Sequence, residues 1–142
     1  MLFMPDVNVL VYAWHEESPK HRTAVEWLQA MMNEGQQLAL STLVAAGAMR
    51  IATNSHIMPR PMSLQLAMAN CRGLLDAGRA VLVGPGPDHW EIFTRLCRLS
   101  GATGNLVSDA QHAAIAIEHG ATWVSFDRDF AQFPGLTWQL LE

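Results

Sequence analysis

Four of the thirteen acidic residues lie where their carboxylates could do chemistry. Asp6 interrupts the apolar stretch LFMPDVNVLVYAW. Burying an isolated carboxylate is costly unless a backbone cap, an arginine or a metal ion compensates its charge. Asp109 lies at the start of the alanine-rich segment SDAQHAAIAI, and Asp127 and Asp129 directly follow the apolar run ATWVSF. The question is therefore which groups balance these four negative charges.

Each aspartate has an ordinary structural explanation when it is taken alone. Asp6 could cap a short helix, Asp109 could be favoured by a helix N-terminus, and Asp127 and Asp129 could be turn or cap residues. Gathered in one pocket, however, the four carboxylates would repel one another and raise each other's pKa. A hard divalent cation removes that conflict, and Mg²⁺ keeps several waters that phosphate oxygens can replace.

The elements that must position these acids alternate along the chain. We predict strands at 1–6, 36–40, 79–84, 121–126 and 137–141, and helices at 7–14, 18–35, 41–54, 63–78, within 84–101, and at 105–120. This alternation indicates an α/β fold with a mainly parallel sheet and helices on both faces. Sites in such sheets lie beyond the carboxyl ends of the strands, where we expect Asp6 and Asp127.

Local signals predict where several helices begin. Ser18 is expected to cap the second helix, with Pro19 at its first position, and Ser41 to cap the third. Asp88 and Glu91 have the spacing of a capping box. Glu118 is expected to be an ordinary surface charge.

Composition limits the class of protein. The 142 residues fit one domain, and 50% hydrophobic with 15% charged residues is typical of a compact folded chain. No apolar run approaches the roughly 20 residues that span a bilayer, and MLFM is too short for a signal peptide. We expect a cytoplasmic protein whose two cysteines, Cys71 and Cys97, are reduced. The net charge of −4 argues mildly against nucleic acid as a partner, although a bound divalent ion can reverse the sign locally.

Three segments together resemble a known family. They are PDVNVLVYA near the start, LSTLVAAGAMRIATN in the middle and GNLVSDAQHAAIAIEHGATWVSFDRDFAQFPGLTW near the end. In this order they resemble the PIN-domain ribonucleases, specifically the VapC-type toxins of bacterial toxin–antitoxin pairs. The resemblance spans nearly the whole chain, and its C-terminal block is the most specific part.

The resemblance implies a single PIN domain over residues 1–142, folded as a three-layer α/β/α sandwich. It also implies an endoribonuclease that depends on Mg²⁺ or Mn²⁺ and cleaves structured RNA such as tRNA or ribosomal RNA. The expected partners are an antitoxin that blocks the site, often with a basic side chain, and a second copy of the chain in a homodimer. No membrane partner is expected.

The same resemblance assigns roles to individual residues. Asp6 and Asp109 match the metal-binding aspartates, and Asp127 matches the later site aspartate that orients water or metal. Three further positions match supporting residues: Asp129 as an accessory acid, and Asn8 and Ser125 as hydrogen-bonding residues.

One departure from the family pattern concerns the third helix. The family usually has a glutamate there, in the place that Gly47 occupies, and residues 35–75 contain no acid. The resemblance then implies a single metal, weaker metal binding or help from Asp129. The alternative is a PIN-fold binding module that has lost catalysis.

Other residues admit two interpretations each. Arg50, Arg60 and Arg128 are candidate RNA contacts, since arginine suits bidentate phosphate binding, or ordinary surface residues. Trp14, Met31 and Met32 are core residues or line a groove for an antitoxin helix.

Two rival chemistries are weaker. A histidine pair could cleave RNA without metal and leave a 2′,3′-cyclic product, but the six histidines show no pairing spacing. His112 lies about one helical turn after Asp109, so it could reach the rim of the site, although we expect a surface role. A phosphoryl acceptor of the dehalogenase type would need D-x-D, and Asn8 stands in the second place.

Overall fold

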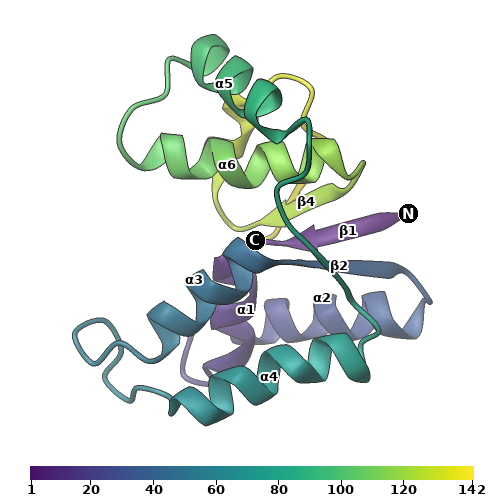
Figure 1. The fold of residues 1–142 in the computed structure, drawn as a ribbon. Helices are drawn as coiled ribbons and strands as arrows, with labels where there is room; N and C mark the ends of the chain where they lie inside the picture. Colours follow the sequence, from purple (N-terminus) through teal and green to yellow (C-terminus); the bar gives the residue numbers. More distant parts are fainter.

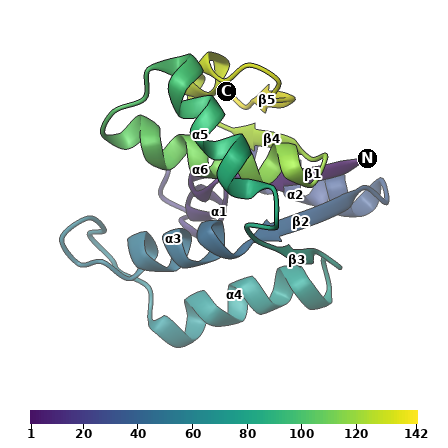
Figure 2. The ribbon, with the colours of Figure 1, turned by 45° about the horizontal axis from the view of Figure 1, so that its top comes forward.

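The computed structural model describes residues 1–142 and contains one five-stranded sheet. Its strands are β1 (Leu2–Pro5), β2 (Gln37–Ser41), β3 (Val81–Val83), β4 (Thr122–Ser125) and β5 (Trp138–Leu140). They lie in the order β3-β2-β1-β4-β5, and every pairing is parallel (Figure 2). The predicted parallel sheet is confirmed, and β1 and β4, which precede Asp6 and Asp127, are neighbours in it.

Helices cover both faces of the sheet, as the alternating pattern predicts. They are α1 (Val7–Trp14), α2 (His21–Asn33), α3 (Thr42–Ala52), α4 (Leu64–Asp76), α5 (His89–Ser100) and α6 (Asn105–Glu118), with a short 3₁₀ helix, η1 (Arg128–Gln132). Helices α1 to α4 form one layer, and α5 and α6 form the other (Figure 1). No helix is both long and apolar enough to cross a membrane.

The core lies between the sheet and these two helix layers. All four residues of β4 are buried, and Trp123 from this strand packs with Phe130 of η1 at 5.2 Å between ring centroids. The buried face of α6 consists largely of alanines, and such small side chains allow the helix to approach the sheet closely. Cys71 and Cys97 are free thiols, as expected.

The predicted start of the second helix was wrong. Helix α2 begins at His21, because residues 18–21 form a turn in which the Ser18 carbonyl accepts the His21 N–H at 3.0 Å. The Ser18 hydroxyl accepts the Lys20 N–H at 3.2 Å within this turn, and Pro19 lies inside it. Ser41 does precede α3, but its hydroxyl forms no cap bond and is buried without a partner.

The predicted capping box was also wrong. The Asp88 side chain caps nothing. Instead Glu118, at the end of α6, accepts the N–H groups of Gly86 at 2.8 Å and Asp88 at 2.9 Å, so it is not an ordinary surface charge. His119 Nε2 lies 2.8 Å from the carbonyl oxygen of Gly84. The end of α6 therefore holds the loop between β3 and α5, a contact that bridges 30 residues or more.

Candidate functional site

Asp6 is the N-cap residue of α1, and its charge is only partly compensated. Its Oδ1 accepts the Val7 N–H at the start of α1, and its Oδ2 accepts the Ser125 hydroxyl, both at 2.6 Å. The residue is only 7% exposed. Burial raises the pKa of Asp6 to about 7, since the two hydrogen bonds offset only part of the desolvation and the nearby charges of Asp109 and Asp127 add to it.

Ser125 connects the start of α1 to the end of β4. Besides donating to Asp6, its hydroxyl oxygen accepts the Asn8 side-chain N–H at 3.3 Å and the Asp127 backbone N–H at 2.9 Å. The Asn8 side-chain oxygen, Oδ1, accepts the Phe126 backbone N–H at 3.3 Å. The structure thus places both predicted supporting residues, Asn8 and Ser125, in one network with two of the predicted acids.

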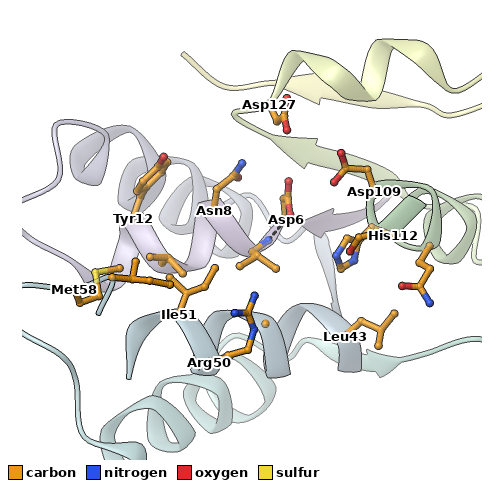
Figure 3. Close-up of a pocket in the computed structure, with 16 residues that line it drawn as sticks. Asp6, Asn8, Tyr12, Leu43, Arg50, Ile51, Met58, Asp109, His112 and Asp127 are labelled. Atoms are coloured by element: carbon orange, nitrogen blue, oxygen red, sulfur yellow. Dashed lines mark hydrogen bonds between the residues drawn. The ribbon is translucent and has the colours of Figure 1, made fainter. Parts of the chain in front are cut away.

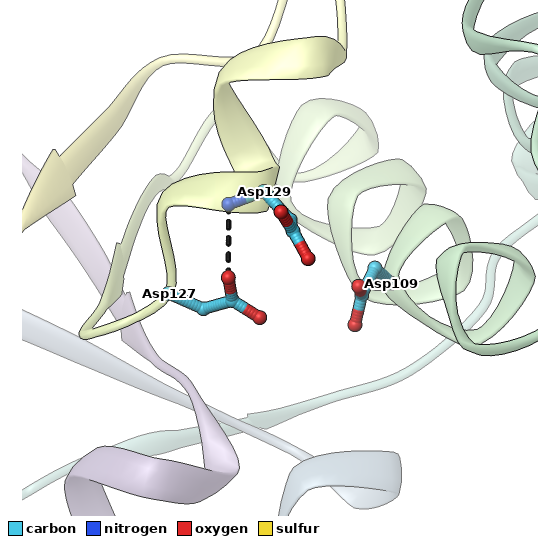
Figure 4. A group of neighbouring side chains, drawn as sticks. All are labelled: Asp109, Asp127 and Asp129. Atoms are coloured by element: carbon cyan, nitrogen blue, oxygen red, sulfur yellow. Dashed lines mark hydrogen bonds between the residues drawn. The ribbon is translucent and has the colours of Figure 1, made fainter.

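Three aspartates meet beside this network. Asp109 comes from α6, Asp127 follows β4 and Asp129 lies on η1, and each offers a carboxylate oxygen within 4.8 Å of the others (Figure 4). Asp127 also accepts the Asp129 N–H at 2.9 Å. Burial first, and then the charges of Asp127 and Asp129, raise the pKa of Asp109 to about 6. We call Asp109, Asp127 and Asp129 the acidic triad.

Two details concern single aspartates. Helix α6 begins at Asn105, as predicted, so Asp109 lies four residues inside it and the helix N-terminus does not explain its charge. Asp6 lies outside the group of three that meets within 4.8 Å, although it lines the same cavity as Asp109 and Asp127 (Figure 3). An all-carboxylate donor set of this kind suits a hard divalent cation such as Mg²⁺ or Mn²⁺.

The cavity beneath these acids has a volume of about 600 Å³. Asp6, Asp109 and Asp127 line its acidic side (Figure 3). The opposite wall is α3, which contributes Gly47 and Arg50 and no acid. A Cβ atom on Gly47 would lie 3.0 Å from Val7 Cγ2, so even a methyl group there is a tight fit. The far end of the cavity is apolar, with the side chains of Val11, Ile51, Ile57 and Met58.

The three candidate arginines differ in their partners. Arg60 pairs with Glu17 at 2.9 Å, and Arg128 pairs with Glu142 at 2.7 Å. Arg50 forms no ion pair and extends from α3 into the cavity (Figure 3). Of the three, Arg50 therefore has the side chain that is free to meet an anion in the cavity.

His112 lines the cavity, so the expected surface role was wrong. Its ring stacks on the buried Trp123, with centroids 5.3 Å apart and an interplanar angle of 18°. Burial lowers the pKa of His112 to about 4. Tyr12 also lines the cavity, although it was not predicted from the sequence as a site residue. Its position four residues after Asn8, on the same helix face, is the signal that could have found it.

A second cavity of about 190 Å³ adjoins the first, and the two share Val11 and Met58. Trp14 lines it, together with Met62 and Leu66. Met31 belongs to the core instead, and Met32 lines neither cavity, so the predicted groove retains only Trp14.

The profile of the PIN domain matches residues 3–136 of this sequence. The chain belongs to the PIN-domain family. VapC ribonuclease Mb2897 of Mycobacterium bovis is 40% identical over 134 residues, which is 94% of this chain and 91% of the relative. Ribonuclease VapC37 of Mycobacterium tuberculosis is 35% identical over 133 residues, covering 94% of this chain and 92% of its own. Within the PIN domains, the chain is therefore a member of the VapC group.

Solved structures share the PIN fold. VapBC2 from Rickettsia felis, bound to a DNA fragment from its promoter, aligns with a TM-score of 0.74 at 18% identity and covers 100% of both chains. The DNA-bound VapBC of Salmonella typhimurium aligns with a TM-score of 0.68 at 18% identity over 98% of each chain. At such identities the likeness concerns the fold, and it confirms the predicted PIN-like α/β/α architecture.

Proposed function

We propose that this PIN domain is a toxin of the VapC type, an endoribonuclease that depends on Mg²⁺ or Mn²⁺ and cleaves structured RNA such as tRNA or ribosomal RNA. The observation that carries the proposal is the convergence of Asp6, Asp109 and Asp127 on one cavity, with Asp129 of η1 beside Asp109 and Asp127. In a chain that belongs to the VapC group, a cation-binding carboxylate site is the arrangement that hydrolysis of a phosphodiester needs.

Asp6 and Asp109 are the residues that we assign to the metal ion, with Asp127 holding a water molecule and Asp129 as an accessory acid. The raised pKa values of Asp6 and Asp109 support this assignment, because carboxylates that are destabilised as anions gain most from a cation. The Val7 N–H and the Ser125 hydroxyl fix the Asp6 side chain in place. Asp6 and Asp109 would hold a divalent ion, which would supply Lewis-acid chemistry at the scissile phosphate and a water molecule of lowered pKa for in-line attack. Since the 2′-hydroxyl is not the nucleophile, the products carry 5′-phosphate and 3′-hydroxyl ends.

Arg50 is the residue that we assign to a phosphate of the substrate. It enters the cavity from the wall opposite the acids and has no carboxylate partner. A guanidinium can bind phosphate with two parallel hydrogen bonds. Arg60 and Arg128, which are already in ion pairs, are weaker candidates for RNA contact.

The partner that we propose is an antitoxin, since the structural neighbours include VapBC toxin–antitoxin complexes. The cavity beside Trp14 adjoins the main one, so an antitoxin helix could place an apolar side chain there and a basic one among the acids. We further propose that residues 1–142 form a single domain that acts in the cytoplasm as a homodimer.

The alternative function is a PIN-fold binding module without catalysis. One observation favours it. The α3 wall contains no acid, and Gly47 stands where the family usually has a glutamate. Negligible affinity for Mn²⁺ would support this alternative.

The test is cleavage of total bacterial RNA by purified, antitoxin-free protein in Mg²⁺, in Mn²⁺ and in EDTA, beside the Asp6→Asn variant. Discrete fragments that need metal and disappear in the folded variant are expected. Fragments that Asp6→Asn still produces at full rate contradict the site assignment. No cleavage in any metal by a folded sample favours the binding module.

A second substrate separates two chemistries. An RNA with a 2′-deoxy nucleotide at the scissile position is expected to be cleaved, because a water molecule attacks. If this substrate resists cleavage and the natural one yields a 2′,3′-cyclic end, a histidine-based mechanism replaces the metal-based one.

A further inference from the structure

The ring of His112 is held in a definite orientation at the acidic end of the cavity. Its Nδ1 atom is buried and has no hydrogen-bond partner. The stack on Trp123 fixes the plane of the ring, and both side chains lie in the interior between α6 and β4. His112 follows Asp109 by three residues on α6, so the two side chains lie on the same face of the helix.

The second ring nitrogen, Nε2, is the one that the cavity can reach. It forms no hydrogen bond with the protein, yet it is not among the buried atoms that lack a partner. His112 as a whole lines the cavity beside Asp109 (Figure 3). A molecule bound in the cavity therefore meets the Nε2 edge of this ring.

The hydrogen atom of the neutral ring belongs on Nε2. Orphaned N–H donors in protein interiors are rarer than under-satisfied acceptors, so the partnerless Nδ1 is better left as a bare acceptor. Burial lowers the pKa of His112 to about 4, which keeps the ring uncharged near neutral pH. His112 thus presents an uncharged N–H donor to the cavity.

We propose that His112 binds the RNA substrate directly by donating its Nε2–H to a phosphate oxygen beside the acidic triad. This inference rests on the proposed ribonuclease function and deepens it. The charged phosphate oxygens are the strongest acceptors that an RNA brings next to the carboxylates. A lysine or arginine at this position would pair with Asp109 and compete with a divalent ion. An uncharged donor binds the phosphate and leaves the charge of the carboxylates available for the metal.

Two variants test the proposal by kinetics. His112→Leu removes the donor and also the unpaired Nδ1, whereas His112→Gln keeps an N–H donor on a side chain of similar length. We expect His112→Leu to lower kcat/KM about tenfold, as the loss of a hydrogen bond to a charged group does. We expect His112→Gln to keep most of the activity. His56→Leu, in the exposed loop after α3, is the matched control and should cleave at the wild-type rate.

A structural role makes the opposite prediction. A histidine that only fills space would be replaced by leucine with unchanged kcat/KM and with equal or higher thermal stability, because an unpaired buried nitrogen is removed. That result overturns the proposal. A loss of Mn²⁺ affinity in His112→Leu also overturns it, since His112 would then act through the metal.

Nitrogen NMR of the imidazole ring provides a test that needs no cleavage. In the wild-type protein in EDTA, we expect the hydrogen of His112 on Nε2, and a short single-stranded RNA at low salt should shift Nε2. A hydrogen on Nδ1, or bound RNA that leaves Nε2 unmoved, overturns the proposal even if the protein cleaves RNA. A protein that cleaves nothing but shows the Nε2 shift contradicts the ribonuclease function and supports the role of His112.

Discussion

The two walls of the main cavity have opposite electrostatic character. On one wall, burial and the nearby charges of Asp127 and Asp129 raise the pKa of Asp109. On the other, α3 contributes Gly47 and the unpaired cation Arg50. This PIN domain therefore gathers its negative charge on one side, where a metal ion fits, and leaves the other side free for an anion. The following predictions would break or sharpen that contrast.

The largest effect is expected from Asp109→Asn on the acidic wall. The amide keeps the shape of the side chain but loses the charge that we assign to metal binding, so cleavage should fall about a thousandfold. Asp129→Asn is the matched control, because Asp129 is the exposed member of the triad, and it should cost only about tenfold. Initial rates on one RNA in Mg²⁺ measure both. Equal losses of cleavage rate in the two variants would contradict the assignment of Asp109 to the metal ion and of Asp129 to an accessory role.

The acidic wall should also make stability depend on pH in the metal-free protein. The pKa of Asp6 is about 7 in the folded state against 3.8 in the unfolded chain, so the folded state holds its proton more tightly. The contribution of Asp6 to the free energy of unfolding is then largest below about pH 4 and falls as the pH rises to 7, by at most ~4 kcal/mol at about 1.4 kcal/mol per pKa unit. Asp109, with a pKa of about 6, adds a smaller change of the same sign. His112, whose pKa is lowered from 6.5 to about 4, contributes with the opposite sign.

Urea unfolding of wild type and Asp6→Asn in EDTA, from pH 4 to pH 8, measures this dependence. The variant should be the more stable protein at pH 8, and its advantage should vanish near pH 4. Added Mg²⁺ should restore the stability of the wild-type protein at pH 8. A wild type that is as stable as Asp6→Asn at pH 8 in EDTA would contradict the burial of a charged Asp6, and this comparison cancels the contribution of His112, which both proteins share.

A carboxylate on the α3 wall should give both walls of the cavity negative charge and add a ligand for the metal ion. We expect Gly47→Glu to tighten Mn²⁺ binding about tenfold, by adding one carboxylate to the donor set. Gly47→Ala is the control for the added Cβ atom, which lies 3.0 Å from Val7 Cγ2. Titration calorimetry with Mn²⁺ compares the three proteins. If glutamate and alanine bind the ion alike, the α3 wall does not reach it.

The smallest effect is expected from the arginines. Arg50→Ala should weaken RNA binding about fivefold and reduce the salt dependence of binding by about one phosphate contact. Arg60→Ala and Arg128→Ala should change affinity less than twofold, because both side chains are exposed and already paired with carboxylates. Fluorescence anisotropy at several salt concentrations gives affinity and slope together. A smaller loss for Arg50→Ala than for Arg60→Ala would remove Arg50 from the substrate site.

Much of the fold and part of the site could be read from the residues. Asp6 and Asp127 each follow an apolar run, and the carboxyl ends of parallel strands share one edge of a sheet, so their meeting was predictable. Asp109 was a candidate from its place in the alanine-rich segment, whereas the resemblance to the VapC toxins supplied Asn8 and Ser125, because it depends on an ordered set of motifs. Helix starts were less predictable, since a local turn at Ser18 competes with helix capping in a way that spacing does not reveal.

The sequence by itself determined the alternation of strands and helices, the acid at each of two strand ends and the absence of acid from residues 35–75. These are properties of local pattern and composition. Only the tertiary structure decided that Arg50 is unpaired, that Glu118 holds a loop and that His112 turns one nitrogen towards the cavity and buries the other. The reason is physical. The state of a polar side chain depends on which partners lie within hydrogen-bonding distance, and those partners come from distant parts of the chain.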